Sequence, residues 1–297
     1  VTLAGNMHIH VVLPLTYQGR NLGVAQTIFA PSEAVLAEMA RKLKRSVILT
    51  IMIVLITSAL LYPVILHLVS KLVVFSRDLL EANLDALSLL ASAIAKRDSD
   101  TDVHNFRVTL YSVRLAEELK LSNDEIQTLI KGAFLHDVGK IGVRDNILLK
   151  PGKLDDEEFS QMKDHVRHGL DIVGSSVWLH DATQVVGSHH EKYDGSGYPE
   201  GTAGEKIPLL ARIFAIADVF DALTSSRPYK GSLSYEESIC LLEKGWGSHF
   251  DPKILDAFIG ISKKLHADYS GRNDQGLRDE LKIVISQYFS RGEILLY

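Results

Sequence analysis

The sequence predicts an all-α fold: a helical bundle that follows one transmembrane helix and a short β-hairpin. Three observations predict this fold class. From Lys96 onward, apolar residues recur at steps of three and four, which is the spacing of helices that bury one face. Residues 46–70 contain no Asp, Glu, Lys or Arg. Residues 8–29 hold two runs rich in Val, Ile and Leu around a polar segment with a glycine, which is a hairpin signal.

Composition narrows the class of protein. The 297 residues are 46% hydrophobic, enough for one large domain or two smaller ones with their own cores. A net charge of -5 and a pI near 6.2 argue against a surface that grips long nucleic acid. A small anionic substrate is compatible with this charge, because bound metal ions reverse the local field. The single cysteine, Cys240, excludes an intrachain disulfide, and we expect it in a helix core.

We expect residues 1–45 to be the C-terminal remnant of an extracytoplasmic sensor domain. Strands over residues 8–15 and 22–29 would flank the polar segment at residues 17–21. Two strands by themselves do not form a stable domain in water. The chain starts at Val1 with no signal segment, so we expect an N-terminally truncated protein whose sensor domain begins upstream.

Residues 46–70 predict a transmembrane helix. At about 1.5 Å per residue this stretch exceeds a hydrocarbon core of about 30 Å. A buried helix of a soluble core is the alternative, but it would not need to be apolar on every face. Pro63 should kink the second half.

The orientation of this helix in the membrane is harder to predict from the sequence. Arg41, Lys42, Lys44 and Arg45 precede it, and counting positive charges alone would place the hairpin in the cytoplasm. We nevertheless expect the C-terminal part in the cytoplasm, because an upstream span would set the topology and the chemistry below needs a nucleotide pool.

Residues 71–95 predict a linker helix with two apolar stripes. The first stripe has the alternating steps of three and four that are typical of a coiled coil and predicts a parallel homodimer: Leu72, Phe75, Leu79, Ala82, Ala86, Leu89 and Ala93. The second stripe predicts a helix that packs on the following domain: Leu80, Leu84, Leu87, Ala91 and Ile94. The sequence leaves both interpretations open.

Residues 96–297 carry the chemistry. Ser122 and Glu125 form a capping box for a helix that leads into His136-Asp137, and Gly139 would stop this helix. A second capping box, Ser234 with Glu237, precedes another helix. Asp218 and Asp221 lie one turn apart in an apolar helix over residues 209–223, where carboxylates are unfavourable unless they are paired or bind a cation.

The candidate ligands are imidazoles and carboxylates, without thiolate: His104, His136, Asp137, His165, His189, His190 and Asp218. This donor set suits iron, manganese or zinc in an open catalytic site. It exceeds what one ion can take, and Asp137 can bridge two, so we expect two or more metals. Such a centre activates water and stabilises the charge of a phosphodiester under attack.

Three basic residues are candidates for contacts with phosphate. Lys140 is placed to reach an anionic oxygen over the cluster, although a solvated surface lysine is the structural alternative. Arg227 and Lys230 would clamp phosphate, or they form a charge pair at a helix end.

These motifs resemble the HD-GYP branch of the HD-domain phosphohydrolases. The resemblance rests on His136-Asp137 with Gly139-Lys140 and on the run from His189 through Asp194-Gly195 to Gly197-Tyr198-Pro199. It covers roughly residues 96–262. It implies an HD-type helical bundle with two or three divalent ions, often iron or manganese, that hydrolyses the bacterial second messenger cyclic di-GMP.

The family's site residues fall on positions of this chain. The same seven ligands are implied, with His136, Asp137 and Lys140 as catalytic residues. Lys140, Tyr198, Arg227 and Lys230 are implied as substrate contacts. Asp100 occupies the position where members with a third metal have a glutamate. Gly195 and Gly197 suit a turn with positive φ that brings Tyr198 to the rim of the site, and in the family this loop is proposed to contact signalling proteins.

The expected function is therefore a membrane-anchored cyclic di-GMP phosphodiesterase that gives linear pGpG and further GMP, regulated through its N-terminal sensor. We expect it in the bacterial inner (cytoplasmic) membrane, with the catalytic domain in the cytoplasm. Two alternatives stay open at this stage. One is a catalytically silent module that binds nucleotide or protein; the other is a phosphohydrolase of another cyclic dinucleotide.

Overall fold

The computed structural model describes residues 2–3, 6–97, 102–226 and 231–289. Within these residues the fold is mostly helical, with short antiparallel sheets near the N-terminus. Contacts divide the chain into two compact units, Val1–Val74 and Phe75–Tyr297, each of which is described by itself.

The first unit contains the predicted hairpin. Strand β3 (Ile9–Tyr17) pairs antiparallel with β4 (Arg20–Phe29), and the shorter β1 (Thr2–Leu3) pairs with β2 (Asn6–Met7). The turn is tighter than predicted, because only Gln18 and Gly19 connect β3 to β4. Both have positive φ, 46° and 75°, which is the conformation of a two-residue turn whose twist matches that of the strands.

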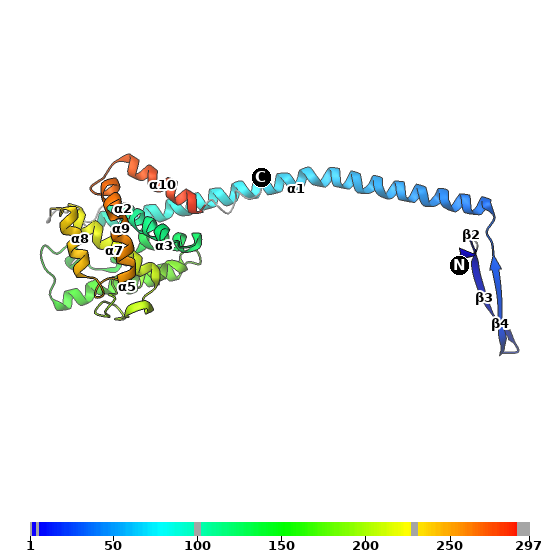
Figure 1. The fold of residues 1–297 in the computed structure, drawn as a ribbon, viewed down its shortest axis with the longest axis horizontal. Helices are drawn as coiled ribbons and strands as arrows, with labels where there is room; N and C mark the ends of the chain where they lie inside the picture. The colour runs from blue at the N-terminus through cyan, green and yellow to red at the C-terminus, as the bar shows by residue number, and fades with distance from the viewer. Residues whose placement is uncertain (1, 4–5, 98–101, 227–230, 290–297) are drawn as a thin grey trace. The chain divides into compact units, whose positions relative to one another are not determined.

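Helix α1 (Glu33–Arg97) starts in the first unit and continues through Pro63 (Figure 1). By length and composition it is the one described helix able to cross a membrane, and none of its most apolar window is buried. An unburied apolar surface of this length is unfavourable in water. The predicted span over residues 46–70 lies inside this helix.

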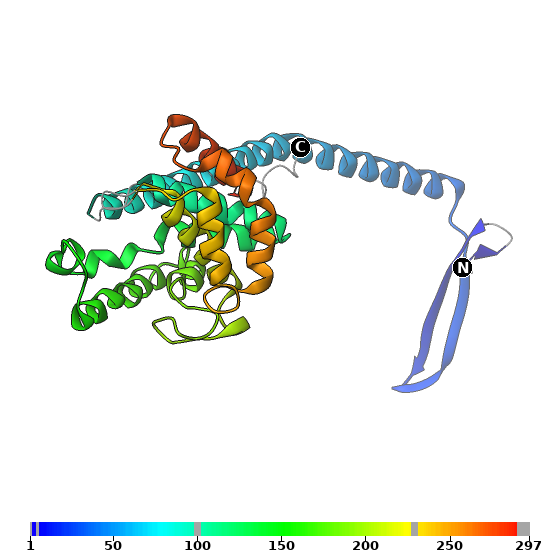
Figure 2. The ribbon, with the colours of Figure 1, turned by 60° about the vertical axis from the view of Figure 1, so that its left-hand side comes forward.

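The second unit is a bundle whose core helices are α2 (Asp102–Glu118), α3 (Asn123–Leu135), α7 (Leu209–Thr224), α9 (Pro252–Tyr269) and α10 (Gln275–Phe289). Helix α2 packs against the other four, and the helices lie side by side in Figures 1 and 2. The remaining elements are η1 (Val138–Gly142), α4 (Asp145–Leu148), α5 (Asp156–Gly174), η2 (His180–Ala182), α6 (Thr183–Val186), η3 (Gly204–Lys206) and α8 (Tyr235–Lys244).

Several helix starts follow the predicted local chemistry. Ser122 and Glu125 form the capping box of α3, and Ser234 and Glu237 form that of α8. Each box satisfies backbone N–H groups that have no partner inside the helix. Cys240 on α8 is exposed, so the prediction of a core cysteine is wrong; α8 turns Ser238 and Leu242 inward instead.

The C-terminal part of α1 belongs to the second unit and uses the second apolar stripe. Leu87, Ala91 and Ile94 are buried in the core of the bundle. Leu79 and Leu89 of the first stripe are 52% and 72% exposed. The helix therefore packs on the bundle through one stripe and leaves the other uncovered in the single chain.

Candidate metal centre

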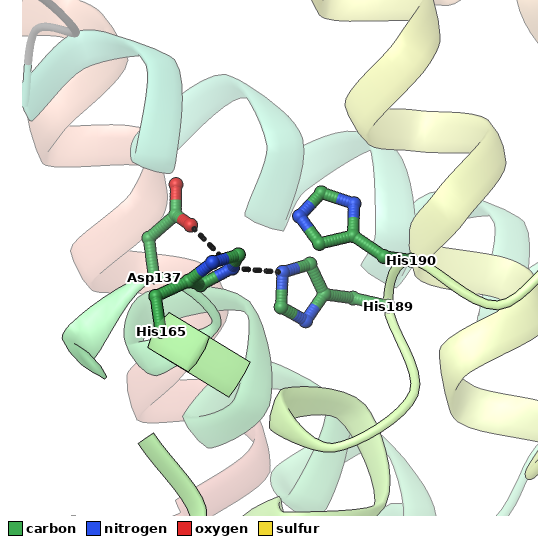
Figure 3. Close-up of side chains that lie close together, drawn as sticks. All are labelled: Asp137, His165, His189 and His190. Atoms are coloured by element: carbon green, nitrogen blue, oxygen red, sulfur yellow. Dashed lines mark hydrogen bonds and ion pairs between the residues drawn. The ribbon is translucent and has the colours of Figure 1, made fainter. Parts of the chain in front are cut away.

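One group of candidate ligands comes from three separate elements. Asp137 directly precedes η1, His165 lies on α5, and His189 and His190 follow α6 (Figure 3). One donor atom from each lies within 4.8 Å of all the others. His165 Nε2 is 3.6 Å from Asp137 Oδ1 and 3.4 Å from His189 Nε2. These donors converge on one point, which is the arrangement that a metal ion requires.

A second group contains His104 of α2, His136 at the end of α3 and Asp218 of α7. His104 Nε2 lies 3.3 Å from Asp218 Oδ1. The two groups meet at Asp137, whose Oδ2 is 3.0 Å from His136 Nε2 while Oδ1 faces His165. One carboxylate thus offers an oxygen to each group, as a ligand that bridges two ions would.

Three of the imidazoles are oriented by the backbone. In His136, His165 and His189 the Nδ1 atom lies 2.7–2.9 Å from the carbonyl oxygen three residues earlier, on Ala133, Met162 and Val186. An Nδ1–H that donates to a carbonyl fixes the tautomer in which Nε2 is free to bind a metal. In each case Nε2 is the atom that faces the site.

His104 is oriented by a carboxylate instead. Its Nδ1 lies 2.7 Å from Asp221 Oδ2. Arg107 holds this carboxylate from the other side, donating from Nε to Oδ1 at 2.5 Å and from Nη2 to Oδ2 at 3.0 Å. This is the carboxylate–histidine arrangement that raises the basicity of a metal-binding imidazole.

The orienting pair was missed by sequence reasoning. Asp221 attracted notice as a carboxylate in an apolar helix, but only Asp218 was given a role. Asp221 and Arg107 are 114 positions apart, and no local pattern links them. The signal in the sequence is that Asp221 stands among Leu, Ile, Phe and Ala in an apolar helix, where a carboxylate needs a partner.

The electrostatics differ between the two groups. In the first group, burial and neighbouring charges keep the imidazoles neutral: the pKa of His189 is well below its usual value because of burial and His190, and the pKa of His190 falls to about 4. Burial also lowers the pKa of His165. Neutral imidazole is the form that binds a metal. Burial would raise the pKa of Asp137, but Lys140 and His136 hold it well below its usual value, so this candidate ligand is ionised.

The second group binds protons more tightly. Burial opposes protonation of His104, but hydrogen bonds to Asp218 and Asp221 raise its pKa to about 10. The pKa of His136 is also raised, because Asp137 outweighs burial. In this group a metal ion would displace protons, so its binding should depend on pH.

Gly139 holds the first motif, His136 to Lys140, against α5. A Cβ atom on Gly139 would lie 1.8 Å from the His165 carbonyl oxygen and 2.4 Å from the Gly169 nitrogen, so only glycine allows this approach. The prediction that Gly139 stops the preceding helix is wrong, because α3 already ends at Leu135 and Gly139 lies inside η1. The close contact brings η1 against the turn of α5 that carries His165.

The second motif, the run from His189 to Pro199, forms a loop beside the candidate ligands. Gly195 has the predicted positive φ of 83°. Gly197 does not, and is required for another reason: its Cβ would lie 2.4 Å from the Lys192 nitrogen. The buried carboxylate of Glu191 accepts hydrogen bonds from two backbone N–H groups further along the loop, at 2.8 and 3.0 Å. The loop places the Tyr198 ring 4.6 Å from the ring of a candidate ligand, His190.

The predicted site residues fall into two sets. The structure brings together His104, His136, Asp137, Lys140, His165, His189, His190, Tyr198 and Asp218. Lys140 Nζ lies 2.8 Å from Asp137 Oδ2. Asp100, Arg227 and Lys230 lie outside the described residues. The roles given to all of these residues stay predictions.

The donor set fits divalent metal ions. Among the described residues both groups consist of imidazole nitrogens and carboxylate oxygens, and no thiolate takes part. Iron, manganese and zinc accept such ligands. The oriented Nε2 atoms and the shared Asp137 carboxylate fit two ions better than one.

Comparison with known proteins gives one family and several relatives. Residues 85–254 match the HD domain family. A cyclic di-GMP phosphodiesterase of Vibrio cholerae is 42% identical over 197 residues, which is 61% of this chain and 40% of the relative. The cyclic di-GMP phosphodiesterase response regulator RpfG of Xanthomonas campestris is 41% identical over 196 residues, 65% of this chain and 52% of the relative.

A third relative has a different name. The 3'3'-cGAMP-specific phosphodiesterase 2 of Vibrio cholerae is 41% identical over 197 residues, covering 63% of this chain and 38% of the relative. The chain thus spans between 38% and 52% of the length of these three curated relatives.

Proposed function

The chain belongs to the HD domain family, and we propose that it is a metal-dependent phosphodiesterase that hydrolyses a cyclic dinucleotide. The observation that carries the proposal is the pair of ligand groups that share Asp137. A purely structural network of ion pairs would need only one partner for each imidazole or carboxylate. Here four such residues gather in one group and three in the other. Water activation and neutralisation of phosphate charge are what divalent ions supply in such a site when bound.

The residues of the chain have separate tasks in this reaction. Asp137 holds the two ligand groups at a fixed separation. Lys140 carries a positive charge beside Asp137 and is placed to bind a non-bridging oxygen of the scissile phosphate. Burial raises the pKa of Tyr198, so its hydroxyl stays protonated near neutral pH and can donate a hydrogen bond. Arg227 and Lys230 are proposed to hold the second phosphate.

Cyclic di-GMP is the substrate that we favour, with linear pGpG and then GMP as products. Support comes from the two relatives named as cyclic di-GMP phosphodiesterases. The cGAMP-specific relative is about as similar, and both nucleotides present a cyclic phosphodiester to the same metal centre. The discriminating contacts are therefore with the bases. We propose iron or manganese as the metal, with two ions and a third if Asp100 is a ligand.

The proposed setting is the cytoplasmic membrane of a bacterium, with the second unit in the cytoplasm. Helix α1 supplies a membrane span, and residues 1–45 a sensor remnant outside. We propose that the first apolar stripe of the linker pairs two chains, because Leu72, Phe75 and Leu89 are exposed at coiled-coil spacing. The loop around Gly195 and Tyr198 is a further candidate surface for a signalling partner.

The direct test is hydrolysis by the full chain in detergent. The purified protein is incubated with Mn²⁺ or Fe²⁺ and with cyclic di-GMP or 3'3'-cGAMP, and the products are separated by chromatography. We expect pGpG from cyclic di-GMP, no product from Asp137→Asn, and unchanged turnover in a control with an exposed histidine removed, His180→Ala. Turnover of cGAMP alone would replace the favoured substrate. Intact nucleotides with every metal would reject the phosphodiesterase and leave the silent binding module.

A further inference from the structure

Arg97 connects the last turn of α1 to the segment that carries the first motif. Its Nη1 donates to the Lys140 carbonyl at 3.2 Å and to the Ile141 carbonyl, and its Nη2 donates to the Val143 carbonyl at 2.8 Å. The same nitrogen lies 2.8 Å from Asp145 Oδ1. One side chain thus contacts four residues in and just after η1, all of them more than 40 positions away in the sequence.

The carbonyls matter more than the carboxylate in this contact. The Asp145 side chain is 71% exposed, and an ion pair in water contributes little. The last turn of a short helix such as η1, in contrast, leaves carbonyl groups with few partners, and the Lys140 carbonyl accepts one backbone N–H, that of Val143 at 3.1 Å, besides Arg97. The planar guanidinium reaches several of them together, which a lysine ammonium cannot do.

The contact acts on the metal centre through η1. Asp137 is the residue just before η1, and Lys140 lies within it. On one side, Gly139 fixes η1 against the backbone of α5. On another, Arg97 fixes it to α1. A shift of η1 would move the shared carboxylate and the lysine together.

Packing between α1 and η1 leaves space beside this contact. A hollow there is lined by Leu90, Ala93, Ile94, Ile141 and Leu148 together with Arg97 and Lys140. Arg97 itself continues the buried stripe of α1, three residues after Ile94. The polar contact therefore attaches η1 to this helix at a place where apolar packing is incomplete.

We propose that Arg97 is a positioning residue through which the end of α1 holds η1, and with it Asp137 and Lys140, in the geometry required for catalysis. The catalytic part of this inference rests on the proposed function. Its consequence is that a movement of α1 changes the position of η1, so that α1 can carry a signal to the metal centre.

The test compares Arg97→Ala and Arg97→Lys with the unchanged full chain in detergent. The matched control is Arg77→Ala, which removes an arginine of the same helix that pairs with Glu81, one turn away. For each protein, Mn²⁺ content, thermal unfolding, kcat and KM for cyclic di-GMP, and hydrogen exchange of residues 138–145 are measured.

We expect kcat per metal-loaded Arg97→Ala protein to fall by roughly 10- to 100-fold, the effect of a misplacement of about 1 Å, with KM changed little. Exchange at residues 138–145 should become about tenfold faster, the effect of losing about one hydrogen bond. Arg97→Lys should lie between, and Arg77→Ala should match the parent. A purely structural role predicts lower thermal stability with kcat per loaded site unchanged.

The inference is overturned if Arg97→Ala keeps both kcat per loaded site and the exchange of residues 138–145 within twofold of the parent. If the parent itself cleaves no cyclic dinucleotide, the proposed function fails, but exchange still decides whether Arg97 holds η1. Unchanged exchange in that case rejects the positioning role independently of activity.

Discussion

Replacement of Asp221 by asparagine should weaken both the fold and the metal centre. The Asp221 carboxylate is 1% exposed and accepts hydrogen bonds from His104 and twice from Arg107. Asparagine has the same shape but only one acceptor oxygen, so its NH₂ group would face a donor. Removing one charge of a buried pair costs about 3 kcal/mol of stability, and losing the partner of a metal-binding histidine costs about 10- to 100-fold in metal affinity.

Asp221 also favours a proton on His104, and this proton competes with a metal ion. Replacing Asp221 therefore lessens the competition, but by less than it weakens metal binding. Asp221 helps to raise the pKa of His104 to about 10, so the same carboxylate also favours a proton on the imidazole. It attracts a doubly charged ion about twice as strongly as a proton at the same place. A net loss of metal affinity therefore remains in the Asp221→Asn protein.

The assay is calorimetric titration of the metal-free full chain with Mn²⁺, together with thermal unfolding in the absence of metal. Asp274→Asn is the matched control, because this carboxylate is 54% exposed and pairs with Arg272 and the Leu277 N–H at the start of α10, where asparagine is also a good cap; we expect unchanged Mn²⁺ affinity and a loss of stability much smaller than that of Asp221→Asn. Equal Mn²⁺ affinity in Asp221→Asn and the parent would refute the orienting role, and an equal loss in Asp274→Asn would show that the effect is not local.

Three further predictions follow from the fold and the site. Gly139→Ala should lower the free energy of unfolding by at least about 3 kcal/mol, because its Cβ would lie 1.8 Å from a backbone oxygen of α5; Gly260→Ala on α9, with nothing within 4 Å, should not destabilise in the same urea titration. The metal-free protein should lose stability as pH falls from 6.5 to about 4, because in this window the unfolded chain binds a proton at His190 that the folded chain, with its pKa lowered to about 4, does not; urea titrations at pH 7 and pH 5 that give equal stability would contradict this. Leu79→Cys in a Cys240→Ser background should form an interchain disulfide in isolated membranes treated with a copper–phenanthroline oxidant if the exposed stripe of α1 is a dimer seam, and a monomer on non-reducing gels after this oxidation would reject that seam.

Local chemistry made much of the fold predictable. The capping boxes at Ser122 and Ser234 set the starts of α3 and α8, because their hydrogen bonds depend only on residues three positions apart. Helical spacing predicted both stripes of the linker. It could not decide between them, because the choice depends on which stripe meets the bundle, and the structure buries the one with Leu87 and Ala91.

The candidate ligands were predictable from the sequence, but the residues that hold them in position were not. A histidine next to an aspartate is visible in the sequence, whereas Gly139 acts through a backbone contact with α5 and Asp221 through an imidazole 117 positions away. Gly19 predicted a turn, but the positive φ of Gln18 that shortens it shows only in the paired strands. In each case the missing information was tertiary contact, which residue spacing does not contain.

Asp137 explains why the supports of η1 should matter more than those of any single histidine. His136, His165 and His189 each belong to one ligand group and are each oriented by a carbonyl three residues earlier, so a small shift of one helix disturbs mainly one group. Asp137 contributes an oxygen to each group, so a shift of η1 changes both at once and also moves Lys140. A site of this kind can be switched by moving one short segment while its histidines stay in place. Variants that loosen η1 should therefore lose turnover before they lose metal, whereas variants at the orienting partners of the histidines should lose metal first.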